Sequence, residues 1–506
     1  MRNSYYPSEE EFLKLTKKGN VIPVYGQINA DLDTPVSAFL KIKKGEYSFL
    51  LESVEGQENI AKFSFLGANP SLVIRSKARN IEIRDFSRKS VRRFITKSDP
   101  LQEIKKIMQR FKAVPIKGLP RFYGGLVGFA GYDLIRFFED IPDKNRDDLR
   151  LPDSVFMLTD TILVFDHINH TIKIVTNVIL PEPKKAALSQ KSKRRLYRQA
   201  LGKIKDIQAQ LKGEITLVKQ KSGKSNKIRI NSNFKRSEFQ EIIKKAKVFI
   251  RKGDIIQTVL SQRFSAKITG EPFDIYRALR SLNPSPYMYF LKFKGFYLVG
   301  SSPEMLVRCE EGVVRTRPIA GTRPRGRNQA EDLRLEKELL HDSKERAEHI
   351  MLVDLGRNDL GRVCKPGTVK LSEFMNVEKY SHVMHLVTEV RGRLQDNLDV
   401  YEVLRAGFPA GTVSGSPKIR AMEIIDELEN LRRGPYAGCV GYFSFSHNMD
   451  TCITIRTIVI KGGVAYIQAG AGIVADSLPN KEYLETVNKA KALFEAIRQV
   501  TPHPNK

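Results

Sequence analysis

The spacing of hydrophobic residues predicts a helix–strand unit that begins in the middle of the chain. Apolar side chains recur at the three- and four-residue intervals of an amphipathic helix at positions 239, 242, 243, 246, 249 and 250. Ser237 and Gln240 have the spacing of a capping box at the start of this helix, and Gly253 is placed to cap its end. The apolar run 255–262, which contains Gln257, then predicts a strand. A new structural unit therefore begins at about residue 237.

Further short apolar runs predict strands in both halves of the chain. They lie at 47–52 and 161–165 in the first half, and at 296–299 and 453–460 in the second. The glycine-rich stretch 124–131 matches neither the dinucleotide-binding nor the P-loop pattern, so it indicates close backbone packing in a sheet. Strands that alternate with helices in this way predict an α+β fold.

Breaks in the pattern divide the chain into three segments. The first, residues 1–180, has mixed strands and helices. A Pro-Glu-Pro sequence then interrupts the pattern, and a basic helix to about Lys212 precedes a stretch rich in Lys, Ser, Gly and Asn. We therefore predict an N-terminal segment over 1–180, a basic helix and linker over 181–236, and a C-terminal segment over 237–506.

Composition excludes several classes of protein. Of 506 residues, 41% are hydrophobic and 28% charged, which is typical of a globular chain and not of a disordered or collagenous one. No run approaches the ~18 apolar residues of a membrane span, and the acidic, polar start does not resemble a signal peptide. The four cysteines have no CxxC spacing, so neither a disulfide framework nor a zinc site is indicated. These features predict a cytoplasmic protein with no membrane partner.

The formal net charge of +28 is concentrated in one segment. Residues 184–236 contain 17 basic and 2 acidic side chains. Such a segment could bind nucleic acid, which makes a nucleic-acid-binding protein an alternative of a different class. It has few aromatic residues to stack on bases and no nucleic-acid motif, so a solvated helix and linker is the favoured interpretation.

Two predicted helices carry paired carboxylates. Glu345 and Glu348 are three residues apart and share a helix face, as do Glu482 and Glu485, with Lys489 one turn further on. Four carboxylates from two helices would offer the oxygen ligands that Mg²⁺ prefers. The commoner interpretation of such pairs is a solvated, salt-bridging helix face, and spacing alone leaves both possibilities open.

Three other features could bind an anion. Gly470 and Gly472 follow a predicted strand, where exposed backbone N–H groups suit an anionic ligand and a tight turn is the alternative. Arg456 lies within the apolar run 453–460 and needs a partner, either a ligand carboxylate or a structural ion pair. His385 is by residue type more often a core or surface histidine than a ligand.

Longer motifs are far more specific than these features. In order they are GDIIQTVLSQ (253–262), SSPE (301–304), PIAGTRPRG (318–326), KERAEHIMLVDLGRND (344–359), YSHVMH (380–385), AGTVSGSPK (410–418), GPYAG (434–438), DTCITIRT (450–457) and QAGAGIVADS (468–477). The set resembles the chorismate-utilising enzymes and, among them, the large subunits (component I) of anthranilate synthases. Weaker similarity extends into the first half through LLES (50–53), GGLVG (124–128) and LPDSVF (151–156). The resemblance implies two facing, mainly antiparallel β-sheets flanked by helices.

The resemblance also assigns roles to the charged residues. Glu348 and Glu485 match the family's Mg²⁺ ligands, and Glu345 and Glu482 match residues that hold waters around the ion. The implied substrate-binding positions, which surround the two carboxylates of chorismate, are Gly321, Thr322, Thr412, Tyr436, Arg456, Gly470, Ala471, Gly472 and Lys489.

The implied reaction adds ammonia to chorismate and then eliminates pyruvate to give anthranilate. Glu304 matches the general acid that protonates the departing hydroxyl, and His385 matches an active-site histidine that we expect to assist pyruvate elimination. Relatives that add water carry a lysine base where this chain has Gln257, which favours amination. Aminodeoxychorismate synthases, the nearest alternative, usually carry a lysine where this chain has Ala320.

Ammonia needs a source outside this chain. No cysteine lies in a glutaminase-like nucleophile elbow, so the resemblance implies a separate glutamine amidotransferase subunit and often a heterotetramer. Feedback inhibition is implied too, because the N-terminal segment over 1–180 contributes to the family's tryptophan pocket. The matching positions are Glu52, Ser53, Pro286, Tyr287 and Met288. Lys62 stands where arginine is usual and lacks its planar fork, which weakens the expectation of tryptophan sensitivity.

Overall fold

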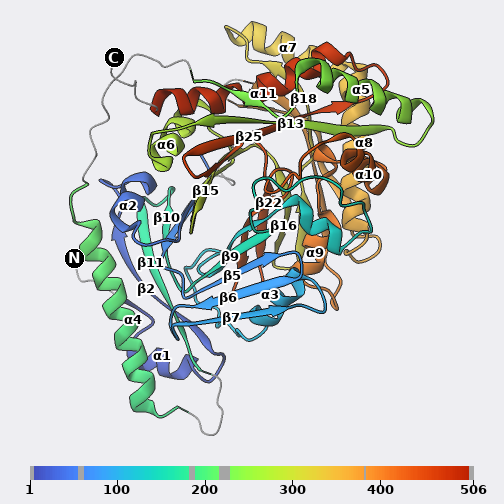
Figure 1. Ribbon diagram of the computed structural model, residues 1–506. Helices are drawn as coiled ribbons and strands as arrows, with labels where there is room; N and C mark the ends of the chain where they lie inside the picture. The colour runs from blue at the N-terminus through green and yellow to red at the C-terminus, as the bar shows by residue number, and fades with distance from the viewer. Residues whose placement is uncertain (1–4, 55–61, 182–187, 216–227, 381–382, 501–506) are drawn as a thin grey trace.

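Two large antiparallel β-sheets organise the chain (Figure 1). The computed structural model describes residues 5–54, 62–181, 188–215, 228–380 and 383–500. Within these residues the first sheet has 13 strands and the second has 12. The two sheets, with helices on their outer faces, confirm the fold class predicted above.

The first sheet combines strands from both halves of the chain. In spatial order it contains β1 (Tyr5–Tyr6), β2 (Val21–Asn29), β11 (Thr171–Ile179), β10 (Thr161–Asp166), β4 (Phe63–Ala68), β3 (Ser48–Glu52), β14 (Tyr287–Phe293), β15 (Phe296–Ser302), β24 (Thr457–Lys461), β25 (Val464–Ile473), β13 (Gln257–Lys267) and β12 (Asn231–Ser232), with β21 (Gly415–Ser416) paired to β13. The two halves meet where β3 pairs with β14.

The second sheet is built in the same way. Its order is β18 (Ile319–Pro324), β20 (Val383–Arg393), β17 (Val313–Thr316), β16 (Met305–Glu310), β23 (Met449–Ile453), β22 (Cys439–Ser444), β8 (Gly125–Ala130), β9 (Ser154–Thr159), β5 (Leu72–Lys77), β6 (Asn80–Asp85) and β7 (Ser90–Ile95), with β19 (Lys370–Lys379) paired to β20. Here the halves meet where β22 pairs with β8. The functional division into 1–180, 181–236 and 237–506 stays a prediction, and both sheets draw strands from before 181 and after 236.

Helices cover the outer faces of the sheets. They are α1 (Glu9–Leu15), α2 (Pro35–Ile42), α3 (Pro100–Met108), α4 (Gln190–Leu211), α5 (Arg236–Arg251), α6 (Pro272–Leu282), α7 (Gln329–His341), α8 (Ser343–Gly361), α9 (Val400–Gly407), α10 (Lys418–Leu428) and α11 (Pro479–Val500), with short 3₁₀ turns η1 (Tyr132–Phe137) and η2 (Gly411–Val413). Helices α2, α4, α6 and α11 pack on the first sheet, and α7 and α8 lie beside β18 and β20.

The main hydrophobic core lies between the two sheets. Phe129 of β8 contacts Phe293 of β14 with ring centroids 5.5 Å apart, and Phe65 of β4 contacts Tyr442 of β22 at 6.1 Å. Close packing also explains the glycine-rich stretch, as predicted. A Cβ atom at Gly128 of β8 would lie 1.9 Å from the carbonyl oxygen of the neighbouring strand, a distance that excludes any side chain.

Two local predictions are wrong. The helix α5 begins at Arg236, not after Ser237, because the carboxylate of Glu238 accepts the backbone N–H of Lys235 at 2.8 Å and so caps the first turn. The run 453–460 is not one strand: β23 ends at its first residue and β24 starts within it. Arg456 lies in the connection with a φ of +49°, a left-handed conformation that interrupts the strand.

The basic helix was predicted correctly, since α4 ends at Leu211 and is capped by Lys212. Its apolar side chains, among them Tyr197 and Ile204, are buried against the first sheet, and most of its basic side chains are exposed. This arrangement fits a solvated helix. The following basic stretch lies partly in 216–227, outside the described residues. Across the described residues no helix is long and apolar enough to cross a membrane.

Candidate active site

Helices α8 and α11 bring the predicted carboxylates close together. Helix α8 starts where the side chain of Asp342 accepts the backbone N–H groups of Lys344 and Glu345, at 3.0 and 3.1 Å. Burial, followed by the negative charges of Glu345 and Glu485, raises the pKa of Glu348. The carboxylates of the two helices therefore lie close enough to repel one another. Spacing alone left open whether the two pairs face each other or the solvent.

On α11 a lysine joins these carboxylates to the first sheet. The ammonium group of Lys489 lies 2.7 Å from the carboxylate of Glu485 and donates a hydrogen bond to the carbonyl of Gly470 on β25, at 3.0 Å. The pKa of Glu482 is raised, first by burial and also by the charge of Glu485. The second helix thus places two carboxylates and one cation at the end of β25.

The donor set has the chemistry that Mg²⁺ prefers, since it consists of carboxylate oxygens that repel one another. Among the described residues, however, no three His, Cys, Asp or Glu side chains lie close enough together to hold a metal ion as they stand. Glu348 and Glu485 come from different helices and are half-buried, and a cation between them would offset the repulsion that helps to raise the pKa of Glu348.

Glycines on β25 allow two side chains to approach its backbone. A Cβ atom at Gly470 would lie 2.6 Å from the hydroxyl of Tyr436, and one at Gly472 would lie 2.6 Å from Nε2 of Gln257. Any side chain at either position would displace these groups. The structure thus gathers Gln257, Tyr436 and Lys489 around the strand that also carries Ala471, and their role in binding a substrate stays a prediction.

The edge of the second sheet supplies the facing wall. Thr322 of β18 pairs with His385 of β20, and the His385 Nδ1–H donates to the carbonyl of Gly321 at 2.9 Å. The neutral imidazole therefore keeps Nε2 as its basic nitrogen. Burial lowers the pKa of His385, and the charge of Arg456 lowers it further. A Cβ atom at Gly321 would lie 3.3 Å from Oε2 of Glu345, so this wall adjoins the carboxylates of α8.

Arg456 is a half-buried cation, and desolvation lowers the pKa of its guanidinium. Of the two partners considered for it, a structural ion pair is not found: within the described ranges no carboxylate lies within salt-bridge distance of its guanidinium. A partly buried arginine without a protein carboxylate is well suited to bind the carboxylate of a ligand.

Glu304 lies in the connection between β15 of the first sheet and β16 of the second, and it is 8% exposed. Burial raises the pKa of its carboxyl to about 8, although the hydroxyl of Thr412 and the charge of Lys489 act in the opposite direction. The side chain is therefore protonated at neutral pH, which is the state that a proton donor needs. Its neighbours, Thr412 on η2 and Lys489 on α11, place it at the same site.

Comparison with known proteins agrees with this geometry. The family model described as chorismate binding enzyme matches residues 46–495. The chain belongs to the chorismate binding enzymes.

Relatives of this chorismate binding enzyme cover almost its whole length. It is 49% identical over 500 residues to anthranilate synthase component 1 of Acetivibrio thermocellus, covering 98% of this chain and 99% of the relative. It is 50% identical over 495 residues to the protein of the same name from Aquifex aeolicus, covering 97% of each. Among solved structures, anthranilate synthase component I from Streptococcus pneumoniae aligns with a TM-score of 0.72 at 37% identity, covering 92% of this chain and 98% of that one. The menaquinone-specific isochorismate synthase of Escherichia coli, at 19% identity and a TM-score of 0.68, shares the fold.

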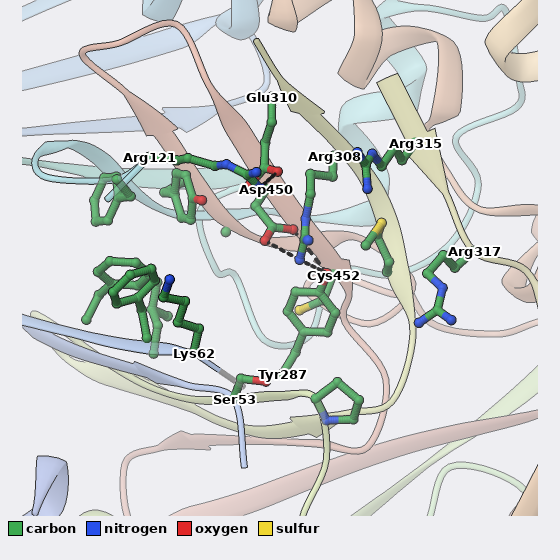
Figure 2. Close-up of a pocket in the computed structure, with 18 of the residues that line it drawn as sticks. Ser53, Lys62, Arg121, Tyr287, Arg308, Glu310, Arg315, Arg317, Asp450 and Cys452 are labelled. Atoms are coloured by element: carbon green, nitrogen blue, oxygen red, sulfur yellow. Dashed lines mark hydrogen bonds and ion pairs between the residues drawn. The ribbon is translucent and has the colours of Figure 1, made fainter. Parts of the chain in front are cut away.

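A second location in this chorismate binding enzyme gathers the positions predicted to bind tryptophan. A cavity of about 820 Å³ lies between the sheets (Figure 2), and its wall includes all five predicted residues: Glu52, Ser53, Pro286, Tyr287 and Met288. Lys62 lines it as well, whereas Glu304, Glu348 and His385 do not. The structure therefore separates the predicted regulatory residues from the predicted catalytic ones.

Sequence reasoning missed the charged part of this cavity wall. Arg308 and Asp450 are partners on adjacent strands and form an ion pair of 2.8 Å, and the hydroxyl of Tyr287 donates to the same aspartate at 3.1 Å. Arg315 and Arg317 extend the charged wall (Figure 2). The available signal was a charged residue inside each of two largely apolar strands, because such residues are rarely buried unless they are paired.

Proposed function

We propose that this chorismate binding enzyme is the synthase subunit of an anthranilate synthase. It would convert chorismate and ammonia into anthranilate, pyruvate and water. The observation that carries the proposal is a pair of groups around strand β25: the buried, protonated carboxyl of Glu304 near Lys489, and the amide of Gln257 against Gly472. An amide cannot deprotonate water, but ammonia is already a nucleophile, so the site needs an acid and no base for its first step. Aminodeoxychorismate synthesis remains the alternative, against which Ala320 argues.

In the first step ammonia attacks ring C2 and the hydroxyl leaves from C4. Hydroxide is a poor leaving group, so we assign Glu304 as the donor that protonates it. Arg456 and Tyr436 bind the enolpyruvyl carboxylate, and backbone groups of Gly470 and Gly472 approach the substrate because no side chain intervenes.

Glu348 and Glu485 would hold Mg²⁺, with Glu345 and Glu482 positioning its waters. When bound, the ion would neutralise the ring carboxylate and withdraw electrons from the ring. Lys489 contacts both the carboxylate of Glu485 and the carbonyl of Gly470, and it would remain close to Glu485 when the ion is bound.

In the second step we assign His385 as the base. Its Nε2 takes the proton from the ring carbon that carries the amine, the C–H electron pair completes the aromatic ring, and the ether C–O bond breaks towards the enolpyruvate oxygen. The enolate then takes up a proton and becomes pyruvate. Because Nδ1–H is held by Gly321, the lone pair resides on Nε2.

Replacing His385 with methionine is expected to separate the two steps. Chorismate should still be consumed, while anthranilate formation falls about 100-fold and an amino-chorismate intermediate accumulates, because general base catalysis contributes ~10²–10⁴-fold. Mass spectrometry of the products measures the ratio. Normal anthranilate formation by H385M would show that the assignment is wrong.

Ammonia would come from a separate glutaminase subunit, the second kind of chain in a heterotetramer. All four cysteines of the chain are buried and free, and burial raises the pKa of Cys309 to about 12, so none has the character of a glutaminase nucleophile. Free buried thiols also fit a reducing compartment, and we place the enzyme in the cytoplasm.

The cavity between the sheets is the proposed tryptophan site. The Ser53 hydroxyl is buried there with no hydrogen-bond partner among the described residues, and such a group is costly unless a ligand uses it. Replacing Ser53 with valine should therefore weaken inhibition by tryptophan about tenfold while kcat stays unchanged. Inhibition curves measure this, and equal inhibition of S53V and the wild type would count against the site.

The proposed function is tested by incubating the purified chain with chorismate, Mg²⁺ and excess ammonium at alkaline pH. We expect fluorescent anthranilate and an equal amount of pyruvate, both abolished by EDTA. Formation of aminodeoxychorismate without pyruvate would instead establish the alternative and show that Ala320 was misinterpreted.

A further inference from the structure

A carboxylate lies directly opposite His385 on the neighbouring strand. Strands β19 and β20 are antiparallel, and their register pairs Glu378 with His385. Residues directly opposite in such a pair project on the same face of the sheet with Cβ atoms ~4.5–5.5 Å apart. Glu378 therefore shares the face on which His385 meets Gly321 and Thr322.

Both oxygens of Glu378 are held in place. One forms an ion pair with Arg317, and the other accepts the hydroxyl of Tyr380 at 2.8 Å. The side chains of Glu378 and Arg317 are only 12% and 11% exposed, so the pair is largely shielded from solvent.

Tyr380, which Glu378 holds by a hydrogen bond, packs against the imidazole of His385. Its ring lies edge-on to that of His385, with centroids 5.8 Å apart. Its backbone is fixed as well, since its N–H donates to Val383 at 2.8 Å and its carbonyl accepts the guanidinium of Arg325 at 2.7 Å. The tyrosine therefore has little freedom to move away from the histidine.

We propose that Glu378 is a positioning residue for His385 in the elimination of pyruvate. Its carboxylate, oriented by Arg317, holds Tyr380 against the imidazole and stabilises the imidazolium that forms when His385 takes the ring proton. This inference rests on the proposed function and extends it to a residue that does not touch the substrate.

The electrostatic environment of His385 agrees with this arrangement. Burial lowers the pKa of its imidazole most strongly and Arg456 acts in the same direction, while the hydrogen bond to Gly321 and then the carboxylate of Glu378 raise it. Burial and a nearby guanidinium both disfavour the protonated imidazole, and the negative charge of Glu378 helps to offset them when His385 accepts a proton. Arg317 also lines the cavity between the sheets, so one arginine contacts both the cavity and the residue that supports His385.

Replacing Glu378 with glutamine tests the proposal. E378Q should form anthranilate about tenfold to 100-fold more slowly than the wild type, with the KM for chorismate nearly unchanged, and should release the amino-chorismate intermediate. E378D, which keeps the charge, should restore anthranilate formation to within about threefold of the wild type. Mass spectrometry and initial rates in chorismate, Mg²⁺ and ammonium provide these measurements.

A neighbouring ion pair on the same strand supplies the control. Lys379 pairs with Glu336 of α7 at 2.8 Å, and E336Q breaks this pair without touching Glu378, so it should behave as the wild type. Thermal unfolding followed by circular dichroism compares the stability of all variants.

The possible outcomes separate the two hypotheses. Anthranilate formation by E378Q at the wild-type rate would overturn the positioning role, and so would a parallel loss of chorismate consumption and anthranilate formation in both E378Q and E378D. If the wild-type chain forms no anthranilate with chorismate, Mg²⁺ and ammonium, the proposed function fails and this inference fails with it. Release of the intermediate by E378Q alone supports both.

Discussion

Replacing Glu304 with glutamine is expected to reduce anthranilate formation by at least about 10³-fold, because the hydroxyl would have to leave without a proton. The carboxyl is buried and already neutral at pH 7, since burial raises its pKa to about 8. Glutamine is neutral and almost the same shape, so folding and chorismate binding should change little. Turnover at saturating ammonium and a thermal unfolding curve measure the two effects.

The pH dependence of the wild type provides an independent check. A general acid acts in its protonated form, so activity should fall as the pH rises through about 8. The concentration of free ammonia must be held constant across the series, because ammonium also loses its proton at alkaline pH. E304D should keep part of the activity and the alkaline decline. A glutamine variant with more than about a tenth of wild-type turnover would contradict the assignment.

The fold was predictable in outline because its motifs are local and its sheet pattern is regular. Strands 161–165 and 296–299 and the basic helix before Lys212 are all present. The failures are local too. The run 453–460 is apolar over most of its length and gives no sign that Arg456 adopts a positive φ, a conformation that the surrounding tertiary structure imposes. The observed cap, in which Glu238 accepts the backbone N–H of Lys235, has the same three-residue spacing as Ser237 and Gln240, so spacing alone could not decide between the two pairs.

The candidate site shows the same limit. Spacing placed Glu345 and Glu348 on one helix face, but it does not predict that α8 and α11, which are more than 100 residues apart in the chain, lie together. The resemblance supplied that expectation. Neither approach found Glu378, because its proximity to His385 arises from the register of β19 and β20, which includes an irregularity between Ser372 and Asn376. Register is a tertiary property, set by the packing of the whole sheet.

Replacing Glu348 with glutamine should remove the proposed Mg²⁺ site. We expect turnover to fall by at least about 10³-fold, since metal catalysis of this kind contributes several kcal/mol to the transition state. Without metal, the variant should be at least as stable as the wild type, because the charges of Glu345 and Glu485 raise the pKa of Glu348 and therefore oppose its ionisation. Isothermal calorimetry with Mg²⁺ alone should detect binding to the wild type and none to E348Q.

The repulsion between Glu348 and its neighbouring carboxylates also predicts how pH changes the affinity for Mg²⁺. Because the pKa of Glu348 is raised, protons compete with Mg²⁺, and the affinity for the metal should increase as the pH rises above the ordinary range of a glutamate. Asp354 on the same helix is 61% exposed and pairs only with Arg357, at 3.1 Å among the described residues, so D354N is a matched control that should bind Mg²⁺ normally. If E348Q bound Mg²⁺ as tightly as this control, the ion would have to be held elsewhere. Retained binding together with lost turnover would make Glu348 a substrate contact, because the carboxylate would then matter only once chorismate is present.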